Sequence, residues 1–214
     1  MDNGVAWSEA AEAVKSGGLA VIPTDTLYGI VASAGHPDAV ERLYRVRGRD
    51  TKKPCIVLIP SLEGILEYIS EDVFHQYEKI FRALWPGPVS MIVPVHDAES
   101  KRGHLHRGTD RIAFRVPDDE ALRAFLVQAG PVVAPSANPE GTKPAETIEE
   151  ARRYFGDQAA VYVDGGKRSG LPTTLLSLSK DAILTVREGS VSVSEIARRI
   201  PGAYRKHLSN STAT

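Results

Sequence analysis

The sequence predicts an α/β protein, because short apolar runs of strand length alternate with segments of helical periodicity. Apolar runs at 19–22, 55–59 and 131–135 are each bounded by proline or glycine, as buried strands commonly are. Between the last two runs, apolar residues recur at helical spacing, most clearly over 73–84. Several runs end in hydroxyl, amide or arginine side chains, which predicts one ligand-binding crevice along an edge of the sheet.

The composition indicates one domain without a strongly charged surface. We expect residues 1–202 of the 214 to form this domain and residues 203–214 to form a flexible C-terminal tail. Because 26 Lys and Arg residues balance 27 Asp and Glu residues, the charge does not indicate a nucleic-acid coat or a membrane surface. No apolar run has the length of a membrane span and no signal peptide is recognisable, so we expect a soluble cytoplasmic protein.

The N-terminal quarter predicts a helix, a strand and a second helix. Ser8 can cap the first helix, a glycine pair ends it, and the strand 19–22 follows. The next segment, 23–29, has the sequence Pro-Thr-Asp-Thr-Leu-Tyr-Gly and is called here the first polar segment. Such a segment either binds a ligand or is a turn whose Thr and Asp side chains bond their own backbone. Pro37 then predicts the first turn of a helix that ends near Arg47.

A basic run lies at the end of this second helix. Its members are Arg42, Arg45, Arg47, Arg49, Lys52 and Lys53. We expect Arg42 and Arg45 to lie on a solvated helix face. The triplet Arg47-Gly48-Arg49 favours a ligand site instead, because a glycine lets a ligand approach the backbone while two guanidiniums reach for it.

The middle of the chain predicts a central strand, two helices and a second pair of strands. The run 55–59 contains the only cysteine, Cys55, which we expect to be buried; a single cysteine excludes an internal disulfide or a cysteine-based zinc site. Ser61 and Ser70 can begin helices, and the second of these stops at a Trp-Pro-Gly-Pro sequence before the strand 89–95.

The loop after that strand contains His104 and His106, which are weak candidates for a metal site because no cysteine or carboxylate motif accompanies them. On the next strand, Arg111 and Arg115 share one face, so they are either solvated or directed at a shared anion. Residues 118–120, Asp-Asp-Glu, are interpreted as capping and dipole partners of a helix that ends at a glycine.

The C-terminal third repeats the pattern of a strand followed by polar side chains. The run 131–135 is followed by the second polar segment, Ser136-Ala137-Asn138, and residues 138–145 are a candidate flap. A capping box predicts a helix that begins at Thr147. Strands are expected at 160–164, 175–178 and 183–186; Thr173 precedes the second, Arg187 follows the third, and Ser192 with Glu195 caps a last helix.

The side chains collected in this way are cations and neutral hydrogen-bonding groups. The sequence contains no nucleophile elbow, no Ser-His-Asp pattern, no carboxylate pair at useful spacing and no Walker loop. Such a set suits a reaction in which the substrate supplies its own nucleophile while the protein positions phosphates. It also suits a site that only binds a nucleotide.

Seven motifs in order resemble those of the YrdC-like domain family and together span about residues 8–200. They are Pro-Thr-Asp-Thr-Leu-Tyr-Gly at 23–29, Arg-Gly-Arg at 47–49, Trp-Pro-Gly-Pro at 85–88, Arg-Val-Pro at 115–117, Pro-Ser-Ala-Asn at 135–138, Asp-Gly-Gly at 164–166 and Arg-Glu-Gly-Ser at 187–190. The resemblance implies an open, twisted, mixed α/β sheet with a concave, positively lined cavity.

The best-known members of this family are threonylcarbamoyl-AMP synthases. The resemblance therefore implies that L-threonine, bicarbonate and ATP with Mg²⁺ give threonylcarbamoyl-AMP and pyrophosphate. The product feeds a downstream threonylcarbamoyl transferase complex that modifies adenosine 37 of tRNA. The resemblance implies neither a tightly bound cofactor nor a protein metal site, because the ATP phosphates mainly hold the Mg²⁺.

The resemblance also assigns residues to the two substrates. It places Thr26, Arg115, Ser136 and Thr173 around threonine. It places Arg49, Lys53, Arg111, Asn138 and Arg187 around ATP, with Arg47 and Arg49 as the candidate catalytic residues.

Two positions depart from the family pattern. Arg47 stands where the family has lysine, and an arginine is not a neutral exchange for lysine at an anion site. Leu58 stands where longer members have histidine, and at 214 residues we expect no additional C-terminal domain. Two alternatives to the synthase therefore stay open: an RNA-binding or ribosome-associated module, and a divergent paralogue that hydrolyses the adenylate.

Overall fold

The computed structural model describes residues 3–96, 102–180 and 182–202. Its helices are α1 (Asn3–Lys15), α2 (Pro37–Arg47), α3 (Glu71–Leu84), α4 (Gly103–His106), α5 (Glu120–Ala129), α6 (Ile148–Phe155) and α7 (Val193–Arg199), with 3₁₀ helices η1 (Leu62–Glu67) and η2 (Gly156–Gln158). The predicted tail, 203–214, lies outside the described residues.

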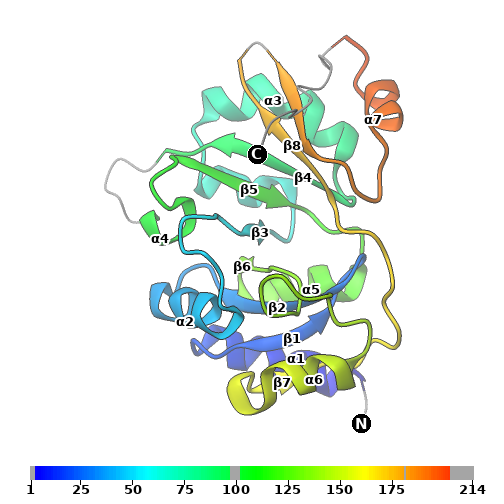
Figure 1. The fold of residues 1–214 in the computed structure, drawn as a ribbon. Helices are drawn as coiled ribbons and strands as arrows, with labels where there is room; N and C mark the ends of the chain where they lie inside the picture. The colour runs from blue at the N-terminus through cyan, green and yellow to red at the C-terminus, as the bar shows by residue number, and fades with distance from the viewer. Residues whose placement is uncertain (1–2, 97–101, 181, 203–214) are drawn as a thin grey trace, which may run out of the picture.

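The strands form one mixed sheet through the middle of the molecule (Figure 1). They are β1 (Ala20–Pro23), β2 (Tyr28–Ser33), β3 (Ile56–Leu58), β4 (Val89–Pro94), β5 (Arg111–Arg115), β6 (Val132–Val133), β7 (Val161–Tyr162), β8 (Thr174–Leu178) and β9 (Ile183–Arg187). Among the described residues, their order in the sheet is β7-β1-β2-β6-β3-β5-β4-β8-β9. The pairs β1/β7, β3/β5 and β4/β8 are parallel and the other pairs antiparallel. This confirms the predicted α/β fold with a twisted mixed sheet.

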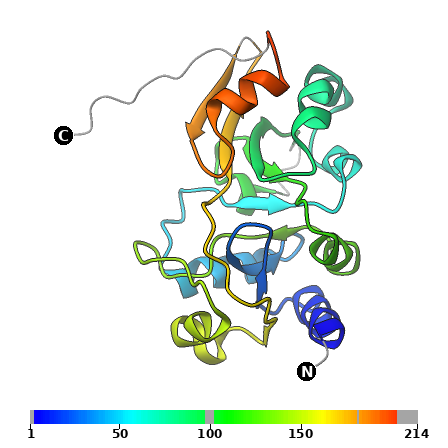
Figure 2. The same ribbon diagram turned by 90° about the vertical axis from the view of Figure 1, so that its right-hand side faces the viewer.

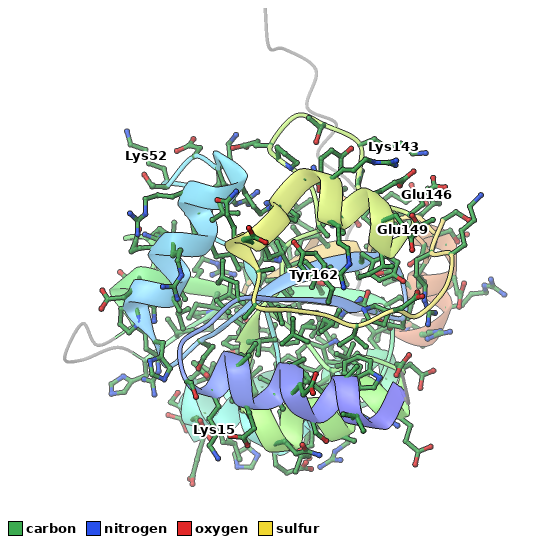
Figure 3. The ribbon with its side chains drawn as sticks, turned by 90° about the horizontal axis from the view of Figure 1, so that it is seen from below. Lys15, Lys52, Lys143, Glu146, Glu149 and Tyr162 are labelled. Carbon is green, nitrogen blue, oxygen red and sulfur yellow. The ribbon has the colours of Figure 1, made fainter. Side chains whose placement is uncertain are left out.

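Helices cover both faces of the sheet, because its strands bury apolar side chains on both sides. On β1, Val21 packs into a core shared with α2, α3 and α6, while Ala20 and Ile22 pack against α1 and α5. Helices α1 and α5 lie side by side, with the rings of Trp7 and Phe125 5.5 Å apart between centroids (Figure 2). Seen from below, α6 lies on one side of the strand layer and α1 on the other (Figure 3).

Local capping follows the predictions closely. The side chains of Ser70, Asp119, Thr147 and Ser192 each accept a hydrogen bond from a backbone N–H in the first turn of their helix. Ser61 precedes the 3₁₀ helix η1. These bonds span at most a few residues, so the local sequence is sufficient to predict them.

One prediction about the N-terminal elements is wrong, and one strand was missed. Helix α1 begins at Asn3, and Ser8 lies inside it, where its hydroxyl donates to the carbonyl of Gly4 at 3.3 Å instead of capping the helix. Strand β2, directly after the first polar segment, was not predicted. All six of its residues are buried, so the alternation that marks a half-buried strand is absent.

None of the described helices is long and apolar enough to cross a membrane.

Candidate functional site

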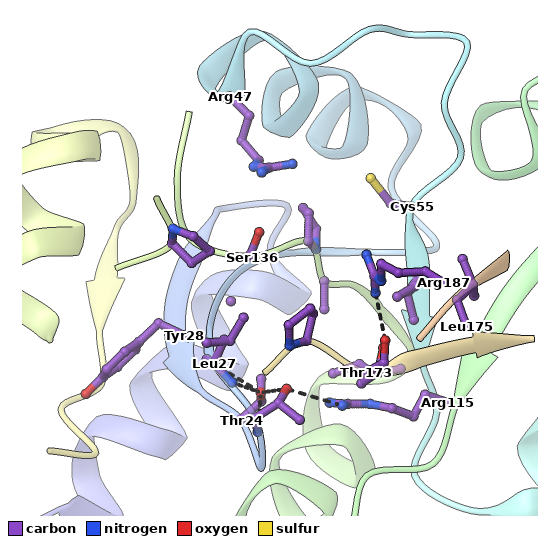
Figure 4. Close-up of a pocket in the computed structure, with 18 of the residues that line it drawn as sticks. Thr24, Leu27, Tyr28, Arg47, Cys55, Arg115, Ser136, Thr173, Leu175 and Arg187 are labelled. Carbon is purple, nitrogen blue, oxygen red and sulfur yellow. Dashed lines mark hydrogen bonds between the residues drawn. The ribbon is translucent and has the colours of Figure 1, made fainter. Parts of the chain in front are cut away.

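A cavity of about 470 Å³ brings together the ends of several strands (Figure 4). Its polar lining comes from the first polar segment, the end of α2 and its following loop, the end of β5, the second polar segment, and β8 and β9. Of the ten predicted site residues, seven line it: Thr26, Arg47, Arg49, Arg115, Ser136, Thr173 and Arg187. Lys53, Arg111 and Asn138 are not among the lining residues.

The first polar segment is the turn of the β1/β2 hairpin. The hydroxyl of Thr24 accepts from the N–H groups of Thr26 and Leu27, both at 3.2 Å, and donates to the Leu27 carbonyl at 2.7 Å. The interpretation as a self-capped turn is therefore confirmed. Thr26 of the same turn also lines the cavity, so a self-capped turn and a ligand-binding role are compatible. Ligand binding by this segment stays a prediction.

Backbone hydrogen bonds hold the second polar segment against the β1/β2 hairpin turn. The N–H of Ile30 donates to the Pro135 carbonyl at 3.1 Å, and the N–H of Ala137 donates to the Tyr28 carbonyl at 2.8 Å. Gly29 itself pairs with Ser136 in an antiparallel bridge. Ser136 consequently lies beside the hairpin turn.

A buried ion pair lies behind Thr26. Arg115 Nη2 is 2.8 Å from Asp25 Oδ1, and the two side chains are 4% and 10% exposed. Arg115 Nη1 also donates to the Thr26 hydroxyl at 3.5 Å, while Asp25 Oδ2 accepts from the N–H of Asp118 at 3.2 Å. Burial lowers the pKa of Arg115, and the Asp25 carboxylate opposes this shift.

Sequence reasoning missed Asp25, although it lies inside the first motif. Its partner Asp118 contributes a backbone N–H to this site, whereas the side chain that caps α5 belongs to Asp119. Only the position of β5 in the sheet shows that Asp25 faces an arginine.

Arg47, the last residue of α2, is bonded to Asn138 of the second polar segment. Arg47, which is 4% exposed, donates through Nε to the Asn138 carbonyl at 2.8 Å and through Nη2 to Asn138 Oδ1 at 3.3 Å. The Ser136 hydroxyl donates to the same Oδ1 at 2.6 Å. Asn138 therefore lies behind the lining and orients Arg47 and Ser136.

Arg47 stands where the family has lysine, and the guanidinium makes a difference here. It donates to two oxygens of Asn138 in a fixed geometry, whereas a lysine ammonium has no such planar arrangement of donors. Arg47 Nη1 is buried and has no hydrogen-bond partner among the described residues, so it keeps a donor for a further group. Burial is the main cause that lowers the pKa of Arg47.

The loop after α2 carries two of the basic residues predicted for ATP, Arg49 and Lys53, and they have different surroundings. Arg49 lines the cavity and donates to the carbonyls of Lys53 at 3.3 Å and Pro54 at 3.2 Å. Lys53 Nζ instead forms an ion pair with Glu140 at 3.0 Å, and its side chain is 59% exposed.

Arg111 and Arg115 lie at opposite ends of β5. A strand rises about 3.3 Å per residue, so these two side chains start about 13 Å apart although they share a face. Arg111 donates to the Ile92 carbonyl, the Ser177 hydroxyl and the Leu178 carbonyl. The alternative of a shared anion for both arginines is therefore not supported by their placement.

Strands β8 and β9 close the remaining side of the cavity. The Thr173 hydroxyl is 2.9 Å from the hydroxyl of Ser90, and Arg187 Nη2 donates to the Thr173 carbonyl at 3.0 Å. Burial, followed by the charge of Arg49, lowers the pKa of Arg187.

Of the other residues considered from the sequence, the two histidines and the two exposed arginines do not line the cavity, whereas Cys55 does. His104 Nε2 bonds the Ala34 carbonyl at 2.8 Å, and His106 Nδ1 accepts from the N–H of Gly108 at 3.1 Å. Within the described ranges, no group of three or more His, Cys, Asp or Glu side chains is arranged to hold a metal ion. Cys55 is buried as predicted, and it also lines the cavity. Arg42 and Arg45 are exposed, as predicted.

The fold and the cavity define an α/β protein with an arginine- and hydroxyl-lined site, a type of site that suits anionic ligands such as nucleotides. The model of the Sua5/YciO/YrdC family, described as "Telomere recombination", matches residues 12–189, and the chain belongs to this family.

Curated relatives carry a consistent name. A threonylcarbamoyl-AMP synthase of Pyrococcus abyssi is 29% identical over 212 residues, which cover 95% of this chain and 62% of the relative. The chain thus spans less than two thirds of the length of that protein. A putative threonylcarbamoyl-AMP synthase of Mycobacterium tuberculosis is 33% identical over 192 residues, which cover 88% of this chain and 86% of the relative.

The solved structures support the same fold. The crystal structure of Pyrococcus abyssi Sua5 complexed with L-threonine superimposes with a TM-score of 0.83 at 28% identity. The match covers 93% of this chain and 58% of the Sua5 chain.

Proposed function

We propose that the protein is an L-threonylcarbamoyladenylate synthase, a nucleotidyltransferase that uses L-threonine, bicarbonate and ATP. The observation that carries the proposal is the cavity itself, because four arginines line the same space as the hydroxyl-bearing residues Thr26, Ser136 and Thr173. Family membership, the names of the relatives and the threonine complex of Sua5 support it.

The inventory of side chains fits a reaction without a protein nucleophile. The threonine amine and bicarbonate form a carbamate with loss of water. A carbamate oxygen then attacks the α-phosphorus of ATP, the bond from this phosphorus to the bridging oxygen breaks, and pyrophosphate leaves. The protein has to align the carbamate with the phosphate and to stabilise the charge that develops, which fixed guanidiniums do well.

In this proposal, two sets of residues bind the two substrates. Threonine is bound by Thr26, Ser136, Thr173 and Arg115, because three hydroxyl-bearing residues and a guanidinium already paired with Asp25 suit a small zwitterion. Arg49 and Arg187 bind the triphosphate, with Arg47 nearby and oriented by Asn138. Lys53 and Arg111 do not line the cavity, and the proposal does not rest on either of them.

Mg²⁺ would reach the site mainly through the ATP phosphates. The carboxylates of Asp25 and Glu140 lie beside site residues, but both are engaged in ion pairs with Arg115 and Lys53. This arrangement fits a cation that is carried by the nucleotide rather than held by a protein cage. Delivery of the product to a downstream transferase that acts on tRNA, and a cytoplasmic location, remain parts of the proposal.

The test is an assay of the purified protein with L-threonine, bicarbonate and Mg·ATP. We expect threonylcarbamoyl-AMP and pyrophosphate in equal amounts, and neither product when threonine or bicarbonate is omitted. If no threonylcarbamoyl-AMP forms with all three substrates present, the proposal is wrong. Consumption of added threonylcarbamoyl-AMP without its synthesis would identify the hydrolytic paralogue.

A further inference from the structure

Two loops meet across the edge of the cavity through Glu140. One loop runs from Arg49 to Pro54 and the other from Ser136 to Pro144, and all four of these end residues line the cavity. Between them, Glu140 Oε2 accepts from the N–H of Asp50 at 2.7 Å, and Glu140 Oε1 accepts from Lys53 Nζ at 3.0 Å. Figure 3, where Lys52 and Lys143 mark the two loops, shows them on the same side of the molecule.

The donors that hold Glu140 are of the type that binds phosphate. A backbone N–H and a lysine ammonium together form a small anion site, and carboxylate and phosphate oxygens compete for such donors. The N–H of Asp50, then Lys53 and Arg49, lower the pKa of Glu140, so all three favour a negative charge at this point. The carboxylate is tied to the end of α2 as well, because the N–H of Glu140 donates to the Arg47 carbonyl at 2.7 Å.

This arrangement explains why Lys53 does not line the cavity. Its ammonium is already neutralised by a carboxylate of the same chain. Arg49 donates to the Lys53 carbonyl at 3.3 Å, so a phosphate that binds Arg49 in the cavity lies close to the loop that carries Lys53. It carries more negative charge than the carboxylate and can engage the same two donors.

We propose that Glu140 is an internal competitor of ATP, whose carboxylate fills the anion site of Asp50 N–H and Lys53 Nζ until a phosphate of the nucleotide replaces it. The inference rests on the proposed function, because that function supplies the nucleotide. Glu140 thereby weakens nucleotide binding in the wild-type protein, and it keeps Lys53 paired when no nucleotide is bound.

The experiment measures the dissociation constant of Mg·ATP by calorimetry for the wild type, Glu140→Gln, Glu140→Ala and the matched control Glu146→Gln. Glu146 lies two residues after the end of the second loop and is also ion-paired, but to Lys143 and Lys167 rather than to Lys53. We expect both Glu140 variants to bind ATP about three- to tenfold more tightly at low salt, since one charged competitor is removed. The gain should shrink as ionic strength rises. The threonine affinity of the Glu140 variants and the ATP affinity of Glu146→Gln should both equal those of the wild type.

Two further arms separate competition from a structural effect. In a Lys53→Ala background, Glu140→Gln should gain much less than it does in the wild type, because the shared donor is absent. If Glu140→Gln binds ATP equally or more weakly while the wild type binds it, the inference is overturned. If the wild type binds no ATP, the proposed function fails instead, and this is measured first.

Discussion

The buried pair of Asp25 and Arg115 fixes a guanidinium beside the hydroxyl of Thr26. A buried ion pair contributes little net stability, but the loss of one partner leaves an uncompensated charge in the interior. At the scale of the single residue, this pair should therefore be the most sensitive point of the site.

We expect Asp25→Ala to lower the free energy of unfolding by about 3–5 kcal/mol, because Arg115 would be left buried without its counter-ion. Urea denaturation measures the change. The double variant Asp25→Ala/Arg115→Met should recover much of the loss, since it removes both charges. A stability of Asp25→Ala within about 1 kcal/mol of the wild type, typical of an exposed ion pair, would contradict the structural role of Asp25.

Arg49 offers a test of the nucleotide side. Arg49→Ala should weaken ATP binding by about 1.5–3 kcal/mol, roughly ten- to more than a hundredfold, because a charge-assisted hydrogen-bond donor is lost. The fold should remain intact, since the side chain is only half-buried. Calorimetric titration with ATP and the thermal midpoint measure the two effects.

Arg45→Ala is the matched control for this prediction. Arg45 is an exposed arginine of α2 that does not line the cavity, so its loss should leave ATP affinity unchanged. Unaltered ATP affinity of a stable Arg49→Ala protein would remove Arg49 from the site.

At the scale of the element, the position of β8 depends on a close crossing by the chain after β9. The N–H of Ser190 donates to the Pro172 carbonyl at 2.9 Å, and the N–H of Gly189 donates to the hydroxyl of Thr174 at 2.9 Å. A Cβ at Gly189 would lie 2.6 Å from the carbonyl carbon of Thr173 and closer still to the Pro172 oxygen. The crossing therefore requires glycine and sets the position of Thr173.

We expect Gly189→Ala to destabilise the protein by about 1–3 kcal/mol, because the backbone must shift to accommodate a methyl group. It should also weaken threonine binding, since Thr173 lies at the displaced segment. Gly103→Ala is the control, because a Cβ there meets no atom within 4 Å. Urea denaturation and threonine titration measure both variants; equal stability of the two would show that the crossing is not tight.

At the scale of the whole molecule, a ligand that binds only the folded state raises its stability by mass action. ATP or threonine at about a hundredfold excess over its dissociation constant should add about 2.7 kcal/mol. For a domain of this size, that corresponds to a rise in the thermal midpoint of about 5–10 °C. Thermal unfolding is measured with each ligand alone and with the two together. The comparison tests whether one cavity binds both substrates.

The overall charge gives the complementary test of the RNA-binding alternative. With a net charge of -1, the protein should show no strong binding to double-stranded RNA at physiological salt. A filter-binding or shift assay over a range of salt concentrations measures this. Salt-sensitive RNA binding that ATP does not alter would favour the RNA-binding module over the synthase.

Several features were predictable because they depend on residues close together in the sequence. The caps at Asp119 and Thr147 bond within their own helix turn. The ordered motifs predicted the family, and they contain most of the residues that line the cavity.

The sequence by itself determined the α/β class, the capped helices and the set of arginines and hydroxyls, because periodicity and short-range hydrogen bonds define them. Only the tertiary structure decided how this set is arranged. It paired Asp25 with Arg115, Lys53 with Glu140 and Arg47 with Asn138, and it placed Arg111 at the far end of its strand from the cavity. These contacts join segments about 90 residues apart in the chain, or depend on which neighbour a strand receives in the sheet, and local sequence does not encode either.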